Sequence, residues 1–158
     1  MVDLIPMSED EFHEYLGPAI AGYAEELVRA GNVASDQAFQ SAEAQFDNLL
    51  PQGLDSPGQH LFSIWDPARS RRVGTLWFGI RDDGDRPFAA LYDFLIFEVY
   101  QRQGYGHQAL LSLEQQVKVL GFDMIRLHVF GHNRAARALY EKMGYVATNV
   151  TMAKRLEE

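Results

Sequence analysis

Hydrophobic and aromatic residues gather in three short runs in the middle of the chain. The runs are HLFSIWD (60–66), RVGTLWFGI (72–80) and FAALYDFLIFEV (88–99). They are rich in aromatic and β-branched residues, and the stretches DPARSRR and RDDGDRP, which favour turns, separate them. Short apolar runs joined by such turns are typical of consecutive antiparallel strands. The pattern therefore predicts a three-stranded antiparallel meander.

The residues before the meander carry helix signals. Residues 2–6 predict a short strand, and Ser8 with Glu11 has the spacing of a capping box, which begins a helix. The pair Gly17–Pro18 predicts that this helix is kinked or split in two, and Gly31–Asn32 is expected to end it. A second helix, capped by Ser35 or Asp36, is expected to run through Leu50. The stretch PQGLDSPG that follows has the composition of a loop.

After the meander the apolar spacing becomes helical again. Residues 104–120 place Leu110, Leu113, Val117 and Leu120 on one helix face. A strand over 124–130 and a short helix over 133–143 are expected next, with Gly144 ending the helix in a left-handed conformation. A final strand, or two, is expected within 145–156. The order of elements predicts one mixed α/β (α+β) domain over residues 1–158.

Composition and charge narrow the function. The chain has no cysteine, which excludes disulfides, thiolate metal sites and a cysteine nucleophile. The N-terminus lacks the basic flank and apolar run of a signal peptide, and no apolar run is long enough to span a membrane, so a cytoplasmic protein is expected. The net charge of −8 argues against nucleic acid as the main partner.

The charge is also unevenly distributed. The first 60 residues hold eleven acidic residues and one basic residue, whereas the remaining residues carry a net charge of +2. Solvated acidic helices explain this distribution most simply. The alternative is that one half of the protein faces a cationic ligand and the other half binds phosphates.

A glycine-rich turn follows the last strand of the meander. The segment GYGHQA satisfies G-x-G-x-x-[GA], a spacing that is used in dinucleotide-binding turns. Such a fold places the turn after the first strand of a parallel unit and an acidic residue at the end of the next strand. Here the turn follows antiparallel strands, and Asp123 precedes its strand. The pattern therefore disfavours a dinucleotide oxidoreductase but keeps a phosphate-binding helix start.

A second motif, HNRAARALYEKMGY (132–145), begins the next helix. Asn133 is a good helix N-cap, and Ala136 and Tyr140 follow on the same face. The side chains on this face are small near the start of the helix, and the phenol of Tyr140 follows two turns later.

Together the two segments resemble the GNAT superfamily of acetyl-CoA-dependent N-acetyltransferases, and within it a bacterial YycN-like branch. The family signature Q/R-x-x-G-x-G/A is matched by Gln101, Arg102, Gln103, Gly104, Tyr105 and Gly106. The signature N-x-x-A-x-x-L-Y-x-x-x-G-F is matched by Asn133, Ala136, Leu139, Tyr140, Gly144 and Tyr145. The resemblance implies a mixed, mostly antiparallel central sheet flanked by helices, with splayed strands that form an acyl-CoA cleft.

The resemblance also implies how acetyl-CoA, as co-substrate, is held. Its pyrophosphate would lie on the amides of residues 101–106, beside Asn133 and Ala136 at the start of the next helix. Its pantetheine would pair with the strand edge that carries Phe94 and Ile96. Arg102, Arg134 and Arg137 are candidates for further phosphate contacts. No metal is implied.

The family comparison assigns the chemistry to a few side chains. Tyr140 resembles the general acid, since a phenol with an ordinary pKa near 10 stays protonated at neutral pH. His128, whose position matches the base in one branch of the family, is a candidate for the base, and Asp93 is a second candidate. Glu25 and Glu26 are candidates for the acceptor mouth. Without a cysteine, the amine is expected to attack acetyl-CoA directly in a ternary complex.

The sequence leaves several questions open. The acceptor amine is a peptide N-terminus, a lysine, a polyamine, an aminoglycoside or another small metabolite. A non-catalytic module that binds acyl-CoA is the alternative to an enzyme. Whether two copies form a homodimer is also open.

Overall fold

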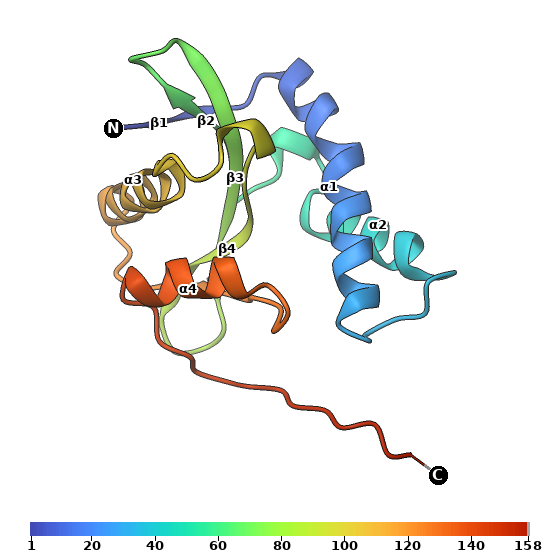
Figure 1. The fold of residues 1–158 in the computed structure, drawn as a ribbon. Helices are drawn as coiled ribbons and strands as arrows, with labels where there is room; N and C mark the ends of the chain where they lie inside the picture. Colours follow the sequence, from blue (N-terminus) through green and yellow to red (C-terminus); the bar gives the residue numbers. More distant parts are fainter. Residues whose placement is uncertain (158) are drawn as a thin grey trace.

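The computed structural model describes residues 1–157, and this part of the chain forms one five-stranded sheet with helices on both faces (Figure 1). In chain order the main elements are β1 (Asp3–Pro6), α1 (Glu9–Arg29), α2 (Ala38–Leu49), β2 (Gln59–Asp66), β3 (Arg71–Asp82), β4 (Pro87–Ile96), α3 (Tyr105–Val119), β5 (Ile125–Leu127) and α4 (Arg134–Lys142). Two short 3₁₀ turns lie at Gly53–Asp55 and Glu98–Tyr100. None of the helices described is long and apolar enough to cross a bilayer.

The strands lie side by side in chain order, β1-β2-β3-β4-β5. The pairs from β1 to β4 are antiparallel, which confirms the predicted meander, and β4 pairs with β5 in parallel. Gly74 lets β3 and β4 approach closely, because a Cβ atom there would lie 2.1 Å from the carbonyl oxygen of Leu95. The sheet is therefore mixed and mostly antiparallel, as predicted.

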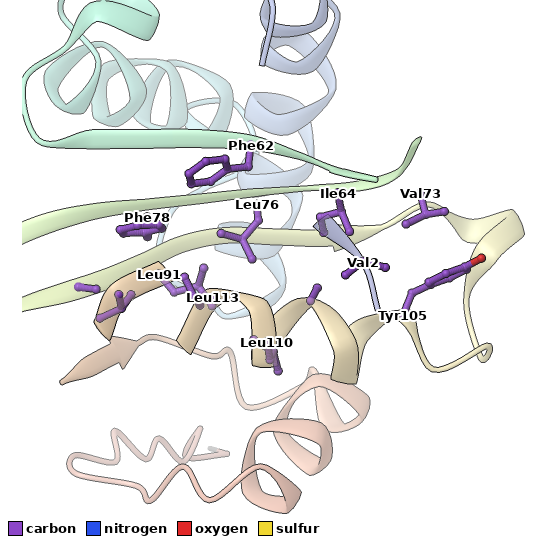
Figure 2. Close-up of a cluster of buried hydrophobic side chains, with 13 residues drawn as sticks. Val2, Phe62, Ile64, Val73, Leu76, Phe78, Leu91, Tyr105, Leu110 and Leu113 are labelled. Atoms are coloured by element: carbon purple, nitrogen blue, oxygen red, sulfur yellow. The ribbon is translucent and has the colours of Figure 1, made fainter. Parts of the chain in front are cut away.

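Alternation along the strands builds two separate cores. On β3, Leu76 and Phe78 face α3, whereas Trp77, between them, faces α1 and α2. Figure 2 shows the first core, in which Leu110 and Leu113 of α3 pack beneath these strand residues. The second core unites the buried faces of α1 and α2 with the other face of the sheet. The sheet thus holds the two helix pairs on opposite sides.

Helix α1 keeps its predicted start and end but is not split. Ser8 and Glu11 form the predicted capping box, and Gly31, at φ 77°, follows the helix end. Pro18 removes one backbone donor, yet the helix continues from Glu9 to Arg29. Its buried residues lie both before and after the proline, so packing on the second core sustains the helix across it. These residues are Phe12, Tyr15, Ile20, Ala24 and Leu27.

The start predicted for the second helix is wrong. Helix α2 begins at Ala38, and its N-cap residue Gln37 makes no side-chain capping bond. Ser35 and Asp36 lie outside the helix, in the turn after α1. Burial of Ala38, Ala42 and Phe46 sets the helix start, because these residues pack against α1 and the sheet.

The C-terminal helices agree with the sequence, whereas the C-terminal strands do not. Helices α3 and α4 occur as predicted, although Leu120 at the end of α3 is exposed. Gly144 has φ 96°, and the amide of Tyr145 donates to the carbonyl of Tyr140 at 3.0 Å, which closes the predicted helix end. Strand β5 is only three residues long, shorter than predicted. The strand predicted within 145–156 is absent from the described residues, since this segment pairs with no strand of its own chain.

Candidate active site

A cavity of about 1020 Å³ opens where β4 separates from β5. The two strands pair only between Ala89–Leu91 and Ile125–Leu127, whereas β4 continues to Ile96. Side chains of α1, α2, β4 and the segment leading into α4 line the cavity. The splayed strands expected from the sequence are therefore present, and a cavity lies in the opening between them.

A β-bulge interrupts the pairing of β4 with β3. Phe78 pairs with Leu91 and Trp77 pairs with Asp93, so Tyr92 is the extra residue. The bulge lies directly after the last residue that pairs with β5. It marks the point at which Asp93 and the following residues turn away from β5 and towards the cavity.

Beyond the bulge, main-chain groups of β4 face the open edge. The carbonyl of Leu95 and the amide of Phe97 point towards β3, so the alternating positions Phe94 and Ile96 point away from it. The Phe94 amide donates to Asp93 Oδ1 at 3.0 Å, and the Ile96 carbonyl accepts a bond from Gln101 Nε2 at 2.9 Å. Phe94 lines the cavity. Two of the predicted site residues, Asp93 and Gln101, thus make hydrogen bonds to main-chain groups at the open edge.

The glycine turn leads into a helix start without a side-chain cap. Arg102 (φ 64°) and Gly104 (φ 84°) both have left-handed backbones, and Gly104 is the N-cap of α3. Helices α1 and α4 are capped by the side chains of Ser8 and Asn133, whereas glycine has no side chain to offer. The first amides of α3 therefore remain available to an anion.

Packing fixes this helix start against its surroundings. A Cβ atom on Gly106 would lie 3.1 Å from Leu139 of α4 and 3.8 Å from Phe94 of β4. Helix α3, helix α4 and the open strand edge therefore meet at Gly106. Glycine at this position lets the three elements approach one another.

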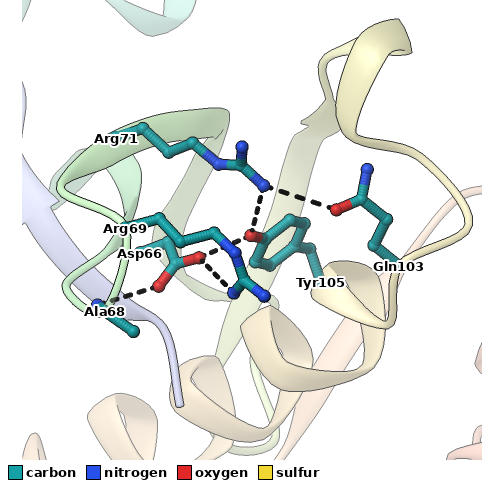
Figure 3. A network of polar contacts seen from close by, with 6 residues as sticks. All are labelled: Asp66, Ala68, Arg69, Arg71, Gln103 and Tyr105. Carbon is teal, nitrogen blue, oxygen red and sulfur yellow. Dashed lines mark hydrogen bonds and ion pairs between the residues drawn. The ribbon is translucent and has the colours of Figure 1, made fainter.

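A polar network links the glycine turn before α3 to the β2–β3 hairpin (Figure 3). Tyr105 donates to Asp66 at 2.5 Å, and Arg71 donates to Tyr105 at 2.9 Å and to Gln103 at 3.4 Å. The hydrogen bond from Tyr105 is the main reason why the pKa of Asp66 lies below its ordinary value. Arg69 adds an ion pair to Asp66 at 3.2 Å. Tyr105 and Gln103 thus anchor the turn to the β2–β3 hairpin.

Helix α4 brings Asn133 and Tyr140 to the cavity wall. Asn133 Oδ1 accepts the Ala136 amide at 3.3 Å, as its predicted capping role requires. Burial raises the pKa of Tyr140 to about 12, with a smaller contribution from the Asp93 carboxylate. The phenol therefore keeps its proton at neutral pH and lies close enough to Asp93 to sense its charge.

Asp93 is held by a buried partner from α1. Tyr15 donates to Asp93 Oδ2 at 2.5 Å, and both side chains line the cavity. Burial raises the pKa of Asp93, while the bonds from Tyr15 and from the Phe94 amide oppose the rise. Burial and the neighbouring carboxylate raise the pKa of Tyr15 well above its ordinary value. The pair joins a proton-accepting carboxylate to a phenol that stays protonated.

His128 and Glu26 also line the cavity, but Glu25 does not. His128 is exposed and packs edge-on against Phe130, with 4.9 Å between the ring centroids. Glu26 of α1 is hydrogen-bonded to His132, whose ring stacks on Phe130. Glu25 is exposed on α1. Of the two glutamates that are candidates for the acceptor mouth, the structure therefore places only Glu26 at the cavity.

Some residues of the candidate site carry no signal in the sequence. Tyr15 carries no motif, since only the tertiary packing of α1 brings it to Asp93. Asp66 and Arg71 lie in a stretch that the sequence marks only as a turn. His132 precedes the N-cap Asn133 of α4, and only the fold brings it to Glu26 of α1. Contacts between residues so far apart in the chain leave no local pattern.

Within residues 1–157, no group of three or more histidine, aspartate or glutamate side chains is arranged to hold a metal ion.

The sequence and the fold agree with known proteins over almost the whole chain. The profile of the acetyltransferase (GNAT) family matches residues 21–145. The chain is 39% identical over 153 residues to YycN, an uncharacterized N-acetyltransferase of Bacillus subtilis (strain 168), with 97% of each chain covered. It is 32% identical over 150 residues to YdgE, an uncharacterized N-acetyltransferase of the same organism, with 95% of each covered.

The solved structures agree with this comparison. The crystal structure of YycN from Bacillus subtilis superposes with a TM-score of 0.94 and covers 100% of both chains. The mixed sheet, the helices on its two faces and the splayed strands are thus those of an acetyltransferase fold. The chain belongs to the acetyltransferase (GNAT) family.

Proposed function

We propose that this protein transfers an acetyl group from acetyl-CoA to a primary amine by direct attack in a ternary complex. The observation that carries the proposal is the convergence of three features on one cavity. These are the open edge of β4, the protonated Tyr140 and the carboxylate of Asp93. The uncapped start of α3 lies beside the same open edge, at Gly106.

The residues fit the phosphate and amide groups of acetyl-CoA. Free amides at the start of α3 suit the pyrophosphate. At the open edge, Asp93 bonds the Phe94 amide and Gln101 bonds the Ile96 carbonyl, so the Phe94 carbonyl and the Ile96 amide are the groups that suit the pantetheine amides. The network behind Tyr105 would keep the turn in shape before the co-substrate binds. Acetyl-CoA supplies the activated thioester, and the side chains of this chain hold and move the protons.

Two proton transfers are assigned to the cavity residues. A protonated amine cannot attack a carbonyl, so Asp93, directly or through water, accepts a proton from the incoming amine. Tyr140 donates a proton to the departing thiolate. His128 is the alternative base, because it lines the same cavity. Acetyl-CoA turnover with a panel of primary amines tests the proposal, and binding of CoA without turnover of any amine would favour a non-catalytic binding module.

Gly104→Asp is expected to weaken CoA binding by about 10- to 100-fold. The new carboxylate would stand where the pyrophosphate is expected, and lost hydrogen bonds to a charged group are worth about 1.5–3 kcal/mol. Titration calorimetry with CoA measures the effect. Gly121→Asp is the matched control, since Gly121 lies at the other end of α3, also has a positive φ (94°) and also faces open space. Equal affinities for the two variants would remove the assignment of the turn to the pyrophosphate.

The acceptor is proposed to be a cationic amine drawn to the acidic α1 wall of the cavity. Glu26→Gln is expected to raise the KM for the amine about fivefold, as one lost attraction of about 1 kcal/mol predicts. Glu25→Gln, one residue away and outside the cavity lining, is the control and should change little. Steady-state kinetics at low and high salt would measure both. A KM that neither variant nor salt alters would show that the acidic wall does not select the acceptor.

A further inference from the structure

The cavity extends beyond the groups that are assigned to acetyl-CoA. Tyr15 of α1 reaches Asp93 from the face of the sheet that α1 and α2 cover. Side chains of both helices line the cavity on this face. An acceptor has to reach Asp93 while acetyl-CoA occupies the open edge of β4. The space between the sheet and the two N-terminal helices is therefore the part of the cavity that remains for the acceptor.

Five aromatic residues from α1, α2, the sheet and the segment before α4 line this space and form an aromatic wall. The ring centroid of Trp77 on β3 lies 5.4 Å from that of Phe46 on α2 and 4.9 Å from that of Tyr92 on β4. The ring of Tyr23 on α1 lies 6.2 Å from Phe46 and 6.3 Å from Phe130. Tyr23, Tyr92 and Phe130 are half-buried, so their rings present apolar surface to the cavity.

The aromatic wall connects two acidic side chains. At one end, Trp77 of β3 pairs with Asp93 of β4. At the other end, Phe130 stacks on His132, which is the hydrogen-bonding partner of Glu26. An ammonium group attracted by Glu26 thus passes over ring faces on its way to Asp93, and such faces favour a cation.

Most polar atoms of the aromatic wall are already bonded within the protein. The Tyr23 hydroxyl donates to Gln45 Oε1 at 2.8 Å, and Trp77 Nε1 donates to Gln59 Oε1 at 2.8 Å. The two phenylalanines have no polar side-chain atom. Four of the five rings therefore have no free proton donor. Such a surface stabilises apolar groups, whereas a hydroxyl group would lose its bonds to water there without replacement.

Helix α1 leaves room beside the aromatic wall. Its cavity lining includes Pro18, Ala19 and Gly22, which have small side chains or none. A Cβ atom built on Gly22 would meet no heavy atom within 4 Å. Since Gly22 directly precedes Tyr23, the free space lies next to one ring of the wall.

We propose that the acceptor is a primary amine that carries an aromatic or branched apolar group, and that this group lies on the aromatic wall beside Gly22. The inference rests on the proposed acetyl transfer and specifies its substrate class. Burial of the apolar group against the rings holds the amine nitrogen near Asp93. An aminoglycoside does not suit this wall, because its hydroxyl groups would find few free partners. A free amine and the first residue of a peptide share the required chemistry.

The preference is tested with acceptors of equal charge that differ in apolar surface. Burial of a phenyl-sized group is expected to make kcat/KM for phenethylamine at least about 10-fold higher than for ethylamine. Kanamycin should be a poorer acceptor than phenethylamine. The peptides Phe-Gly-Gly and Gly-Gly-Gly form a second pair, and the better of the two aromatic acceptors identifies the source of the amine. Equal values within both pairs, or kanamycin as the best acceptor, would overturn the proposal.

Filling the space beside the aromatic wall tests its position. Gly22→Leu is expected to fold, because leucine is a better helix former than glycine and the position is open. Its side chain would occupy the acceptor space, so the ratio of kcat/KM for phenethylamine to that for ethylamine should fall about 10-fold. Ala21→Leu is the control, since Ala21 is exposed on the same helix and lies outside the cavity lining. An equal ratio in the two variants would remove Gly22 from the acceptor space.

Binding without chemistry separates this inference from the proposed acetyl transfer. Calorimetry with saturating CoA is expected to give a Kd for phenethylamine at least about 10-fold lower than for ethylamine. Phe130→Ala should remove most of this difference, whereas Phe39→Ala, at a half-exposed ring of α2 outside the cavity lining, should keep it. Ring-dependent binding without acetylation of any amine would refute acetyl transfer and keep the ligand class. Acetylation with equal kcat/KM for phenethylamine and ethylamine would refute the ligand class and keep acetyl transfer.

Discussion

Replacement of Tyr140 by phenylalanine is expected to lower kcat about 10²-fold and to leave acetyl-CoA affinity nearly unchanged. Phenylalanine keeps the ring that packs in the cavity wall and removes only the proton donor. General-acid catalysis by a placed side chain is worth about 10²–10⁴ in rate. Because burial raises the pKa of Tyr140 to about 12, the phenol remains protonated through the whole working range of pH. No basic limb due to Tyr140 should therefore appear between pH 6 and about 10.

Tyr145→Phe is the matched control for this experiment. The two rings are neighbours, with centroids 5.7 Å apart, and the Tyr145 hydroxyl is buried without a hydrogen-bond partner among the described residues. Its removal should leave kcat within about twofold of the wild type. A more acidic thiol departs with less help from an acid. With an acetyl thioester of such a thiol in place of acetyl-CoA, the loss of kcat in Tyr140→Phe should therefore be smaller. Equal deficits for both variants, or a deficit that the thiol does not alter, would contradict the acid role.

Local signals account for most of the fold that the sequence predicted. The meander follows from period-two apolar runs and turns, and the helix ends at Gly31 and Gly144 follow from glycines that take positive φ. The errors lie where tertiary contacts override local preference. Pro18 does not divide α1, because the buried face of the helix continues past it. The late start of α2 also follows from the burial of its apolar face, and no side-chain cap marks this start in the sequence.

The candidate site divides in the same way. Motif spacing identified the turn around Gly104 and the helix face of Tyr140, since each depends on one continuous segment. The partners of these segments come from elsewhere in the chain. Tyr15 meets Asp93 across 78 residues, and Glu26 meets His132 across 106. Only the packing of α1 over the opening of the sheet brings such residues together, so spacing along the chain could not show them.

The identity of the base can be decided by pH, because Asp93 and His128 predict different responses. A base works in its unprotonated form, so kcat/KM rises with pH through the pKa of the base. Burial raises the pKa of Asp93, and the acidic limb should therefore lie above the range of an ordinary carboxyl group. Asp93→Asn keeps the shape of the side chain and should lower kcat/KM about 10²-fold, with loss of this limb. His128→Ala should keep the limb at the same midpoint.

Tyr15→Phe gives the sharpest form of this prediction, because it alters the base without removing it. The hydrogen bond from Tyr15 Oη to Asp93 Oδ2, at 2.5 Å, stabilises the charged carboxylate and so holds its pKa down. Its loss should raise the pKa of Asp93 further and move the acidic limb to higher pH, while the rate above the limb is largely kept. Tyr23→Phe removes a phenol that lines the same cavity but bonds to Gln45, so it serves as the control. A limb that persists in Asp93→Asn and disappears in His128→Ala would assign the base to His128, and Tyr15 would then be a structural partner of Asp93 alone.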